Sequence, residues 1–173
     1  MRFATDKTGH GYLPTYLRIA AELGPSARVC EVGVHAGRGL DMFQALFPTG
    51  LVAGVDVDPR CQWPEGTVPV ICAQDDETLP GLLAAHSPQW DLFVDDASHD
   101  GKLTAETFRL LWPLVAPGGF YVVEDWMVGL GGWGFDASML TTVQGLLSLL
   151  TKGGDVEDIT YRYGLAVLRK KAP

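Results

Sequence analysis

The chain has 173 residues, with 13 lysines and arginines against 21 aspartates and glutamates, and so carries a formal net charge of −8. This acidic balance argues against broad phosphate neutralisation by clustered basic residues, and a hydrophobic content of 47% argues against intrinsic disorder. No apolar run reaches the roughly 20 residues of a membrane-spanning helix, and the opening residues lack the apolar region of a signal peptide. We therefore expect a cytoplasmic protein with no nucleic-acid or membrane partner.

Short apolar runs alternate along the chain with segments of helical periodicity, the pattern typical of a parallel sheet covered by helices. In chain order we expect a helix over 12–23, a strand over 27–34, a helix over 40–47, strands over 51–57 and 68–73, a helix over 79–85, a strand over 90–94, a helix over 103–114, a strand over 120–123, a mobile glycine-rich loop over 129–134, a helix over 138–150, and strands over 156–161 and 165–168. These elements predict one α/β domain over residues 1–173, in which residues 1–25 form an amino-terminal helix and lid segment.

The three cysteines, Cys30, Cys61 and Cys72, show no C-x-x-C spacing and are interpreted as reduced thiols.

A glycine-rich turn follows the first expected strand and reads E-x-G-x-x-x-G-x-G over residues 31–39. Glycines in such a turn let a ligand approach the backbone closely. Asp56 ends the next strand, where a carboxylate can accept both hydroxyls of a ribose. Because the spacing differs from the dinucleotide pattern and Glu31 would repel a pyrophosphate, a cationic sulfonium or ammonium suits the turn better. The alternative is a plain strand–helix turn with a solvated Asp56.

The third expected strand leads into the polar run Gln74-Asp75-Asp76-Glu77. A polar side chain here could hydrogen-bond the amino group of an adenine. Equally, the three acids could stabilise the start of the next helix through its dipole. Both interpretations stay open from the sequence.

Two acidic pairs, Asp95-Asp96 and Glu124-Asp125, each follow an expected strand. The carboxyl ends of parallel strands meet at one edge of a sheet, so these four carboxylates should converge near Asp56. They would repel one another unless a cation were present, and a hard divalent ion such as Mg²⁺ would resolve that conflict. His99, three residues after Asp96, is placed for general-base work beside this cluster.

These motifs resemble the class I S-adenosylmethionine (SAM)-dependent methyltransferases, and more specifically the metal-dependent sugar O-methyltransferases of macrolide, aminocoumarin and related antibiotic pathways. The resemblance covers most of the chain and is carried by several motifs: Thr5-Asp6-Lys7 with His10, Tyr12 and Tyr16, then Glu31-Val-Gly33-Val with Gly37, Gly54-Val-Asp56-Val-Asp58-Pro59, Phe93-Val-Asp95-Asp96-Ala-Ser98-His99, and Pro117-Gly118-Gly119-Phe-Tyr121-Val-Val-Glu124-Asp125. The last two motifs are the specific ones.

The resemblance implies a Rossmann-like sheet of seven mostly parallel strands, with one antiparallel strand and helices on both faces. It implies SAM and Mg²⁺ as cofactors and a small-molecule acceptor, with methyl transfer to a hydroxyl of a natural product, taken as a sugar. The implied cofactor-binding residues are Glu31, Gly33, Val34, Gly37, Asp56, Val57, Gln74, Asp76 and Asp95. The implied metal ligands are Asp96, Glu124 and Asp125, and the implied catalytic residues are His99 as general base together with Asp96.

Two features depart from the family pattern. The family usually carries Gly-Asp-Gln after the third strand, whereas this chain has Cys72-Ala73-Gln74, so the adenine contact passes to Gln74 or Asp76. The chain also lacks the extra domain or long lid of some relatives, which leaves the amino-terminal segment, the 129–134 loop or a second subunit of a homo-oligomer to build the acceptor site. The rival hypotheses are a methyltransferase fold with a catechol-type or hydroxylase-like reaction, and a non-catalytic SAM-binding protein.

Overall fold

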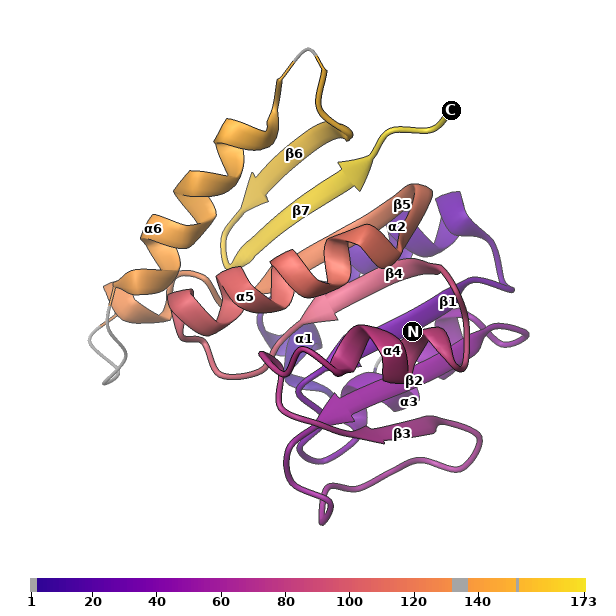
Figure 1. Cartoon of the computed structure of the whole chain (residues 1–173). Helices are drawn as coiled ribbons and strands as arrows, with labels where there is room; N and C mark the ends of the chain where they lie inside the picture. The colour runs from indigo at the N-terminus through magenta and orange to yellow at the C-terminus, as the bar shows by residue number, and fades with distance from the viewer. Residues whose placement is uncertain (1–2, 132–136, 152) are drawn as a thin grey trace.

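The computed structural model describes residues 3–131, 137–151 and 153–173. Its sheet has seven strands in the order β3-β2-β1-β4-β5-β7-β6 (Figure 1). The strands are β1 (Arg28–Val32), β2 (Leu51–Asp56), β3 (Val68–Ile71), β4 (Trp90–Asp95), β5 (Val115–Glu124), β6 (Val156–Arg162) and β7 (Leu165–Lys170). Strand β7 pairs antiparallel with both β5 and β6, while the pairs among β1 to β5 are parallel. The expected mostly parallel α/β sheet is confirmed.

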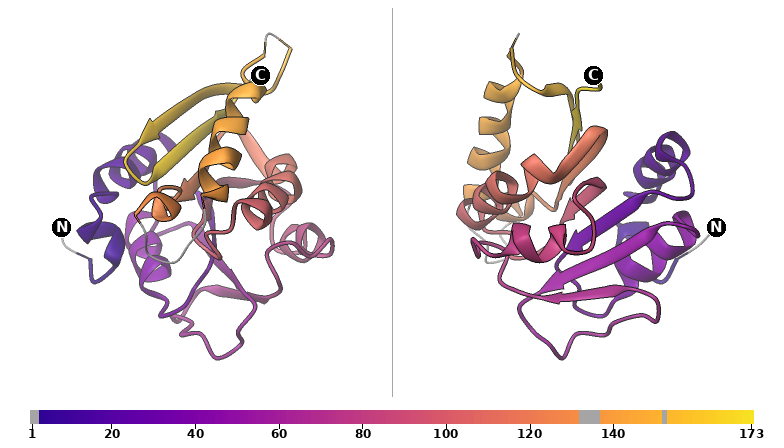
Figure 2. Two further views of the ribbon diagram at one scale, coloured as in Figure 1. Left: turned by 90° about the vertical axis from the view of Figure 1, so that its left-hand side faces the viewer. Right: turned by 45° about the vertical axis from the view of Figure 1, so that its right-hand side comes forward.

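The helices cover both faces of this sheet (Figures 1 and 2). They are α1 (Asp6–Gly9), α2 (Leu13–Leu23), α3 (Arg38–Leu46), α4 (Leu79–Ala84), α5 (Gly101–Leu111) and α6 (Ser138–Gly145), with 3₁₀ turns η1 (Trp112–Leu114), η2 (Val128–Leu130) and η3 (Leu146–Leu149). None of these helices is long and apolar enough to cross a bilayer. Asp100 caps the start of helix α5, where its carboxylate accepts the N–H groups of Lys102 and Leu103 and so satisfies donors that the first turn leaves unpaired.

Alternation along the central strands builds two cores, one on each face of the sheet. On β4, Phe93 packs into the core beneath α4, α5 and α6, whereas Leu92 and Val94 pack into the core beneath α2 and α3. Strand β5 repeats the pattern, with Tyr121 on the first face and Val122 on the second. Because successive side chains of a strand point to opposite faces, a strand covered on both faces is largely apolar, as the sequence pattern predicted.

The structure differs from the expected elements mainly at their ends. Strand β5 begins at Val115 rather than Phe120, because residues 116–119 bulge out between the pairs Trp90–Val115 and Leu92–Phe120. The helix expected over 103–114 ends at Leu111 and tightens into η1, where Pro113 offers no N–H to an α-helical ladder. Of the loop expected over 129–134, residues 129 and 130 belong to η2, and residues 132–134 lie outside the described residues.

The strand order positions the functional site. After β1 the chain adds β2 and then β3 on one side of β1. It then crosses over and adds β4 on the other side, so the strand order reverses between β1 and β4. Ligands of open α/β sheets bind outside the carboxyl ends of the strands at such a switch point. The glycine turn follows β1, Asp56 ends β2, and the Asp95-Asp96 pair spans the end of β4.

Candidate active site

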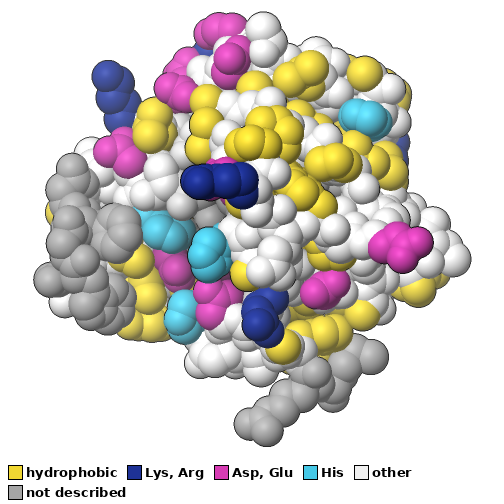
Figure 3. All heavy atoms as spheres, turned by 90° about the horizontal axis from the view of Figure 1, so that it is seen from below, with side chains coloured by type: hydrophobic (Ala, Val, Ile, Leu, Met, Phe, Trp, Pro, Cys, Tyr) yellow, Lys and Arg dark blue, Asp and Glu magenta, His cyan; other side chains and the backbone are white. Residues whose placement is uncertain are grey.

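A cavity of about 650 Å³ opens at the carboxyl ends of β1, β2 and β4. Its volume lies within the range of small-molecule sites. The glycine turn, Asp56, Gln74 and residues 96–99 line it from the sheet, and the segment 5–7 lines it from the amino terminus. Histidine and acidic side chains gather around the hollow on this face of the molecule (Figure 3).

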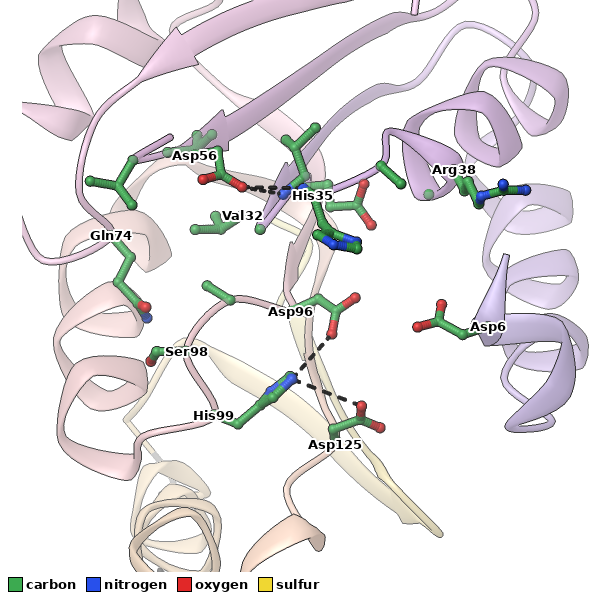
Figure 4. A pocket seen from close by; sticks show the side chains of 18 of the residues that line it. Asp6, Val32, His35, Arg38, Asp56, Gln74, Asp96, Ser98, His99 and Asp125 are labelled. Atoms are coloured by element: carbon green, nitrogen blue, oxygen red, sulfur yellow. Dashed lines mark hydrogen bonds and ion pairs between the residues drawn. The ribbon is translucent and has the colours of Figure 1, made fainter. Parts of the chain in front are cut away.

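Asp56 is fixed by backbone donors at the cavity wall. Its Oδ2 accepts the N–H groups of Val34 at 2.8 Å and His35 at 3.2 Å, and its Oδ1 accepts the N–H of Asp58 at 2.9 Å. Partial burial would raise the pKa of Asp56, but the N–H donors of Asp58, Val34 and His35 hold that pKa below its ordinary value. The carboxylate is therefore a charged acceptor at the position expected for a ribose contact (Figure 4).

Gly33 follows β1 and lets the backbone that follows β4 approach it closely. Its φ is +97°, and a Cβ built on it would lie 2.1 Å from the backbone oxygen of Asp96. We expect Gly33→Ala to lower the free energy of unfolding by clearly more than the ~1–2 kcal/mol cost of positive φ alone. Gly118→Ala is the matched control, since its φ is +78° with nothing within 4 Å of the added Cβ. Equal losses for the two variants in urea unfolding would contradict the close-approach argument.

Lys7 of α1 lies at the centre of the acidic cluster. Its side chain is only 2% exposed, and its ammonium donates to Asp96 Oδ2 at 2.6 Å and to Glu124 Oε2 at 2.9 Å, with Glu31 Oε1 at 3.1 Å. The sequence predicted that converging carboxylates need a cation, and a side chain of the chain itself supplies one. Lys7 appeared in the sequence only as part of the family resemblance, and no local pattern pointed to its partners, 89 and 117 residues away.

Burial and charge oppose one another in this cluster. Burial would lower the pKa of Lys7, but Glu124, Glu31 and Asp96 together raise it well above its ordinary value, so the ammonium is charged. Burial raises the pKa of Glu31 to about 7 against the pull of Lys7, and it raises that of Glu124 likewise. The raised pKa values mean that Glu31 and Glu124 each carry less than a full negative charge near neutral pH, which reduces the negative charge that one ammonium must compensate.

Two tyrosines of the amino-terminal segment also bond to this cluster. The Tyr16 hydroxyl donates to Glu124 Oε1, and the Tyr12 hydroxyl donates to Asp125 Oδ1. The i, i+4 spacing of these tyrosines, at the start of a helix, is a sequence signal that could have placed both on one face toward the sheet. The amino-terminal segment is thus part of the site.

Asp96, His99 and Asp125 form a second group at the cavity mouth. One ligand atom of each lies within 4.8 Å of the others, and His99 Nε2 is 4.0 Å from both Asp96 Oδ1 and Asp125 Oδ2. Figure 4 shows the His99 ring between the two carboxylates. His99 and Asp125 both have a φ of +54°. Such backbone is costly for residues other than glycine and clusters at functional sites.

The donor chemistry of this group suits a hard divalent ion. Carboxylate oxygens are the ligands that Mg²⁺ prefers, and it keeps several positions for water or substrate. Of the expected ligands, Asp96 and Asp125 therefore belong to the group. Glu124 lies beside it, with its carboxylate bonded to Lys7 and Tyr16.

The remaining predicted cofactor residues are divided between the cavity and its surroundings. Glu31, Gly33, Val34, Val57 and Gln74 line the cavity, and the Gln74 amide donates to the Thr107 hydroxyl. Three others are not among the described lining residues: Gly37, Asp76 and Asp95.

These three residues have different local surroundings. Gly37 precedes α3 with a φ of +69°. Asp76 is exposed and accepts the backbone N–H and the hydroxyl of Thr78 just before α4, in line with the helix-start interpretation. Asp95 is buried and accepts the Tyr121 hydroxyl at 3.4 Å.

Comparison with known proteins places this arrangement among methyltransferases. No protein-family model matches the chain. The chain is 34% identical over 146 residues to the 8-demethyl-8-(2-methoxy-alpha-L-rhamnosyl)-tetracenomycin-C 3'-O-methyltransferase of Streptomyces olivaceus, covering 77% of this chain and 37% of that protein. It is 32% identical over 150 residues to the demethylmacrocin O-methyltransferase of Streptomyces fradiae, covering 79% and 38%. The chain thus spans less than two fifths of the length of these relatives.

The fold comparison agrees with the sequence comparison. The MycE methyltransferase of the mycinamycin biosynthetic pathway, solved in complex with Mg, SAH and mycinamycin VI, superposes with a TM-score of 0.79 at 24% identity, covering 93% of this chain and 49% of that one. At that identity the likeness establishes the fold. The chain is therefore a protein of the class I methyltransferase fold, homologous to the sugar O-methyltransferases of macrolide and related antibiotic pathways.

Proposed function

We propose that this chain supplies the SAM- and Mg²⁺-binding catalytic part of an O-methyltransferase that acts on a sugar hydroxyl of a small natural product. The observation that carries the proposal is the convergence of Asp96, His99 and Asp125 at the mouth of the cavity that Asp56 lines. The name of the tetracenomycin relative, an O-methyltransferase of a rhamnosylated compound, supports the acceptor class.

The cavity residues suit the proposed cofactor. Asp56 accepts the ribose hydroxyls, and Gln74, which follows β3, is the candidate for the adenine. Five acidic side chains line the wall against the basic Lys7 and Arg38, which favours a ligand bearing a sulfonium and an ammonium; the acids are Asp6, Glu31, Asp56, Asp96 and Asp125.

The reaction divides between bound groups and side chains. SAM would supply an activated methyl group when bound, and Asp96 and Asp125 would hold Mg²⁺, which would supply Lewis-acid stabilisation of negative charge on the acceptor oxygen. His99 takes the proton of the acceptor hydroxyl on a ring nitrogen. Asp96 Oδ1 and Asp125 Oδ2 each lie 4.0 Å from His99 Nε2 and flank the ring. Holding the acceptor oxygen against the methyl carbon provides much of the remaining acceleration.

Heat stability with and without ligands tests this function. SAM should raise the melting temperature, by the equivalent of about 2.7 kcal/mol at one hundred times its dissociation constant, and EDTA should weaken turnover. Asp56→Ala should lose the SAM effect, whereas Asp58→Ala, at an exposed ion pair with Arg60, should keep it. Turnover is measured as SAH release with demethylmacrocin and the rhamnosylated tetracenomycin as acceptors. No stabilisation by SAM would overturn the proposal, and stabilisation by SAM with no turnover, whether or not a divalent ion is added, would favour a non-catalytic SAM-binding protein.

A further inference from the structure

Lys7 occupies one oxygen of Asp96 and one of Glu124, two of the three carboxylates that the family resemblance assigns to a divalent ion. Its ammonium bonds Asp96 Oδ2 at 2.6 Å and Glu124 Oε2 at 2.9 Å, and its side chain is 2% exposed. The second oxygen of Glu124 accepts the Tyr16 hydroxyl. Both oxygens of Glu124 thus have partners, so Glu124 reaches an ion only by giving one of them up.

A divalent ion bound to Asp96 Oδ2 would lie close to the Lys7 ammonium. Mg²⁺ binds carboxylate oxygens at about 2.1 Å. An ion on Asp96 Oδ2 would therefore lie within about 5 Å of the Lys7 nitrogen, because that oxygen is itself 2.6 Å from the nitrogen. Two positive charges at that distance in a buried site repel strongly, since little water screens them.

The segment that carries Lys7 has few other attachments. Helix α1 has four residues, which is too short to be stable without tertiary contacts. Among the described residues, the segment is also held by its Thr5 cap, by Phe3, which packs against the core beneath α2 and α3, and by the Arg38 guanidinium, which donates to the Ala4 carbonyl at 3.0 Å. Thr5, Asp6 and Lys7 line the cavity, so any movement of Lys7 changes the cavity wall.

We propose that Lys7 and a divalent ion are alternative cations for Asp96 and Glu124, so that binding of the ion releases Lys7 and loosens α1 at the cavity wall. In this arrangement Lys7 is a positioning residue, which holds the carboxylates together until the ion takes its place. The inference rests on the proposed function, because it requires that the site take a divalent ion.

Amine labelling of the wild-type chain tests the release directly. A short pulse of an acetylating reagent is given in EDTA and in saturating Mg²⁺, and each lysine is quantified by peptide mass spectrometry. We expect Lys7 acetylation to rise about tenfold or more with Mg²⁺, because the amine leaves a fully buried position. The exposed Lys102 is the internal control and should not change. Unchanged labelling of Lys7 in saturating Mg²⁺ would overturn the proposal.

The affinity for Mn²⁺, followed by the loss of the free-ion EPR signal, provides the second test. Lys7→Met should bind Mn²⁺ about tenfold tighter or more than the wild type, because it removes the competing charge. Lys7→Arg keeps the charge and should bind about as the wild type does, and Lys102→Met is the matched control. Equal or weaker binding by Lys7→Met would overturn the competition. If Lys7→Met does not fold, the labelling result on the wild type decides.

The two tests separate this inference from the proposed function. Mn²⁺ binding to the wild type with constant Lys7 labelling would overturn the competition and leave the metal-dependent function intact. Absence of Mn²⁺ binding from every variant, with SAM still raising the melting temperature, would overturn both the competition and the metal part of that function.

Discussion

Replacing His99 by alanine should lower the rate of methyl transfer by about 10²- to 10⁴-fold, the usual contribution of a general base, while leaving SAM affinity nearly unchanged. The ring nitrogen that would take the acceptor proton lies 4.0 Å from Asp96 and Asp125, and the cofactor contacts proposed for Asp56 and Gln74 do not involve it. Turnover is measured as SAH release with the glycosylated acceptors named above, and SAM affinity by calorimetry.

The controls separate chemistry from folding. His99 has a φ of +54°, where alanine is strained, so His99→Asn is the companion variant, because asparagine tolerates left-handed backbone. Both variants lack the base and should lose turnover alike. His86→Ala, at an exposed position after α4, should retain wild-type rates. Wild-type turnover by His99→Asn would remove His99 as the base.

Asp95→Asn should make the protein more stable at pH 8 and flatten the dependence of stability on pH. Burial raises the pKa of Asp95 from 3.8 to about 7, and the neighbouring Asp96 adds to the shift. Between these two values the folded state keeps a proton that the unfolded state has released, so the wild type loses stability as pH rises from about 4 to 7 and levels off above. At 1.36 kcal/mol per unit, the loss amounts to at most about 4 kcal/mol.

Urea unfolding from pH 4 to 8 measures this effect. Asparagine has nearly the same shape and stays neutral, so the variant should lack the share of the slope that Asp95 contributes. Glu31 and Glu124 also have raised pKa values and will leave a residual slope in the variant. Asp75→Asn, at an exposed position, is the control and should follow the wild type. An Asp95→Asn curve parallel to that of the wild type would show that Asp95 does not titrate in this range.

Local patterns in the sequence were sufficient for the sheet and for one edge of the site. A strand buried on both faces is largely apolar, which allowed β2, β4 and β5 to be predicted, and the acidic residues that end or follow each one lie at the carboxyl edge of a parallel sheet. Asp56, Asp96 and Asp125 were placed at that edge by this reasoning, and the structure brings them to one cavity or its mouth. The ends of elements were harder to predict from the sequence. Strand β5 is an example, because the bulge over 116–119 depends on pairing with β4.

The partners of the acids were decided by tertiary structure. The sequence indicated that clustered carboxylates require a cation and suggested Mg²⁺, yet Lys7 reaches three of them from a four-residue helix at the far end of the chain. Asp95 and Asp96 are neighbours in sequence, but alternation along β4 directs Asp95 into the core toward Tyr121 and leaves Asp96 at the cavity. Residue type and strand position thus determined where charge would gather, because they depend on local periodicity. The pairing of Lys7 with Asp96 and Glu124 depended on contacts across 89 to 117 residues, because only the packed fold brings those side chains together.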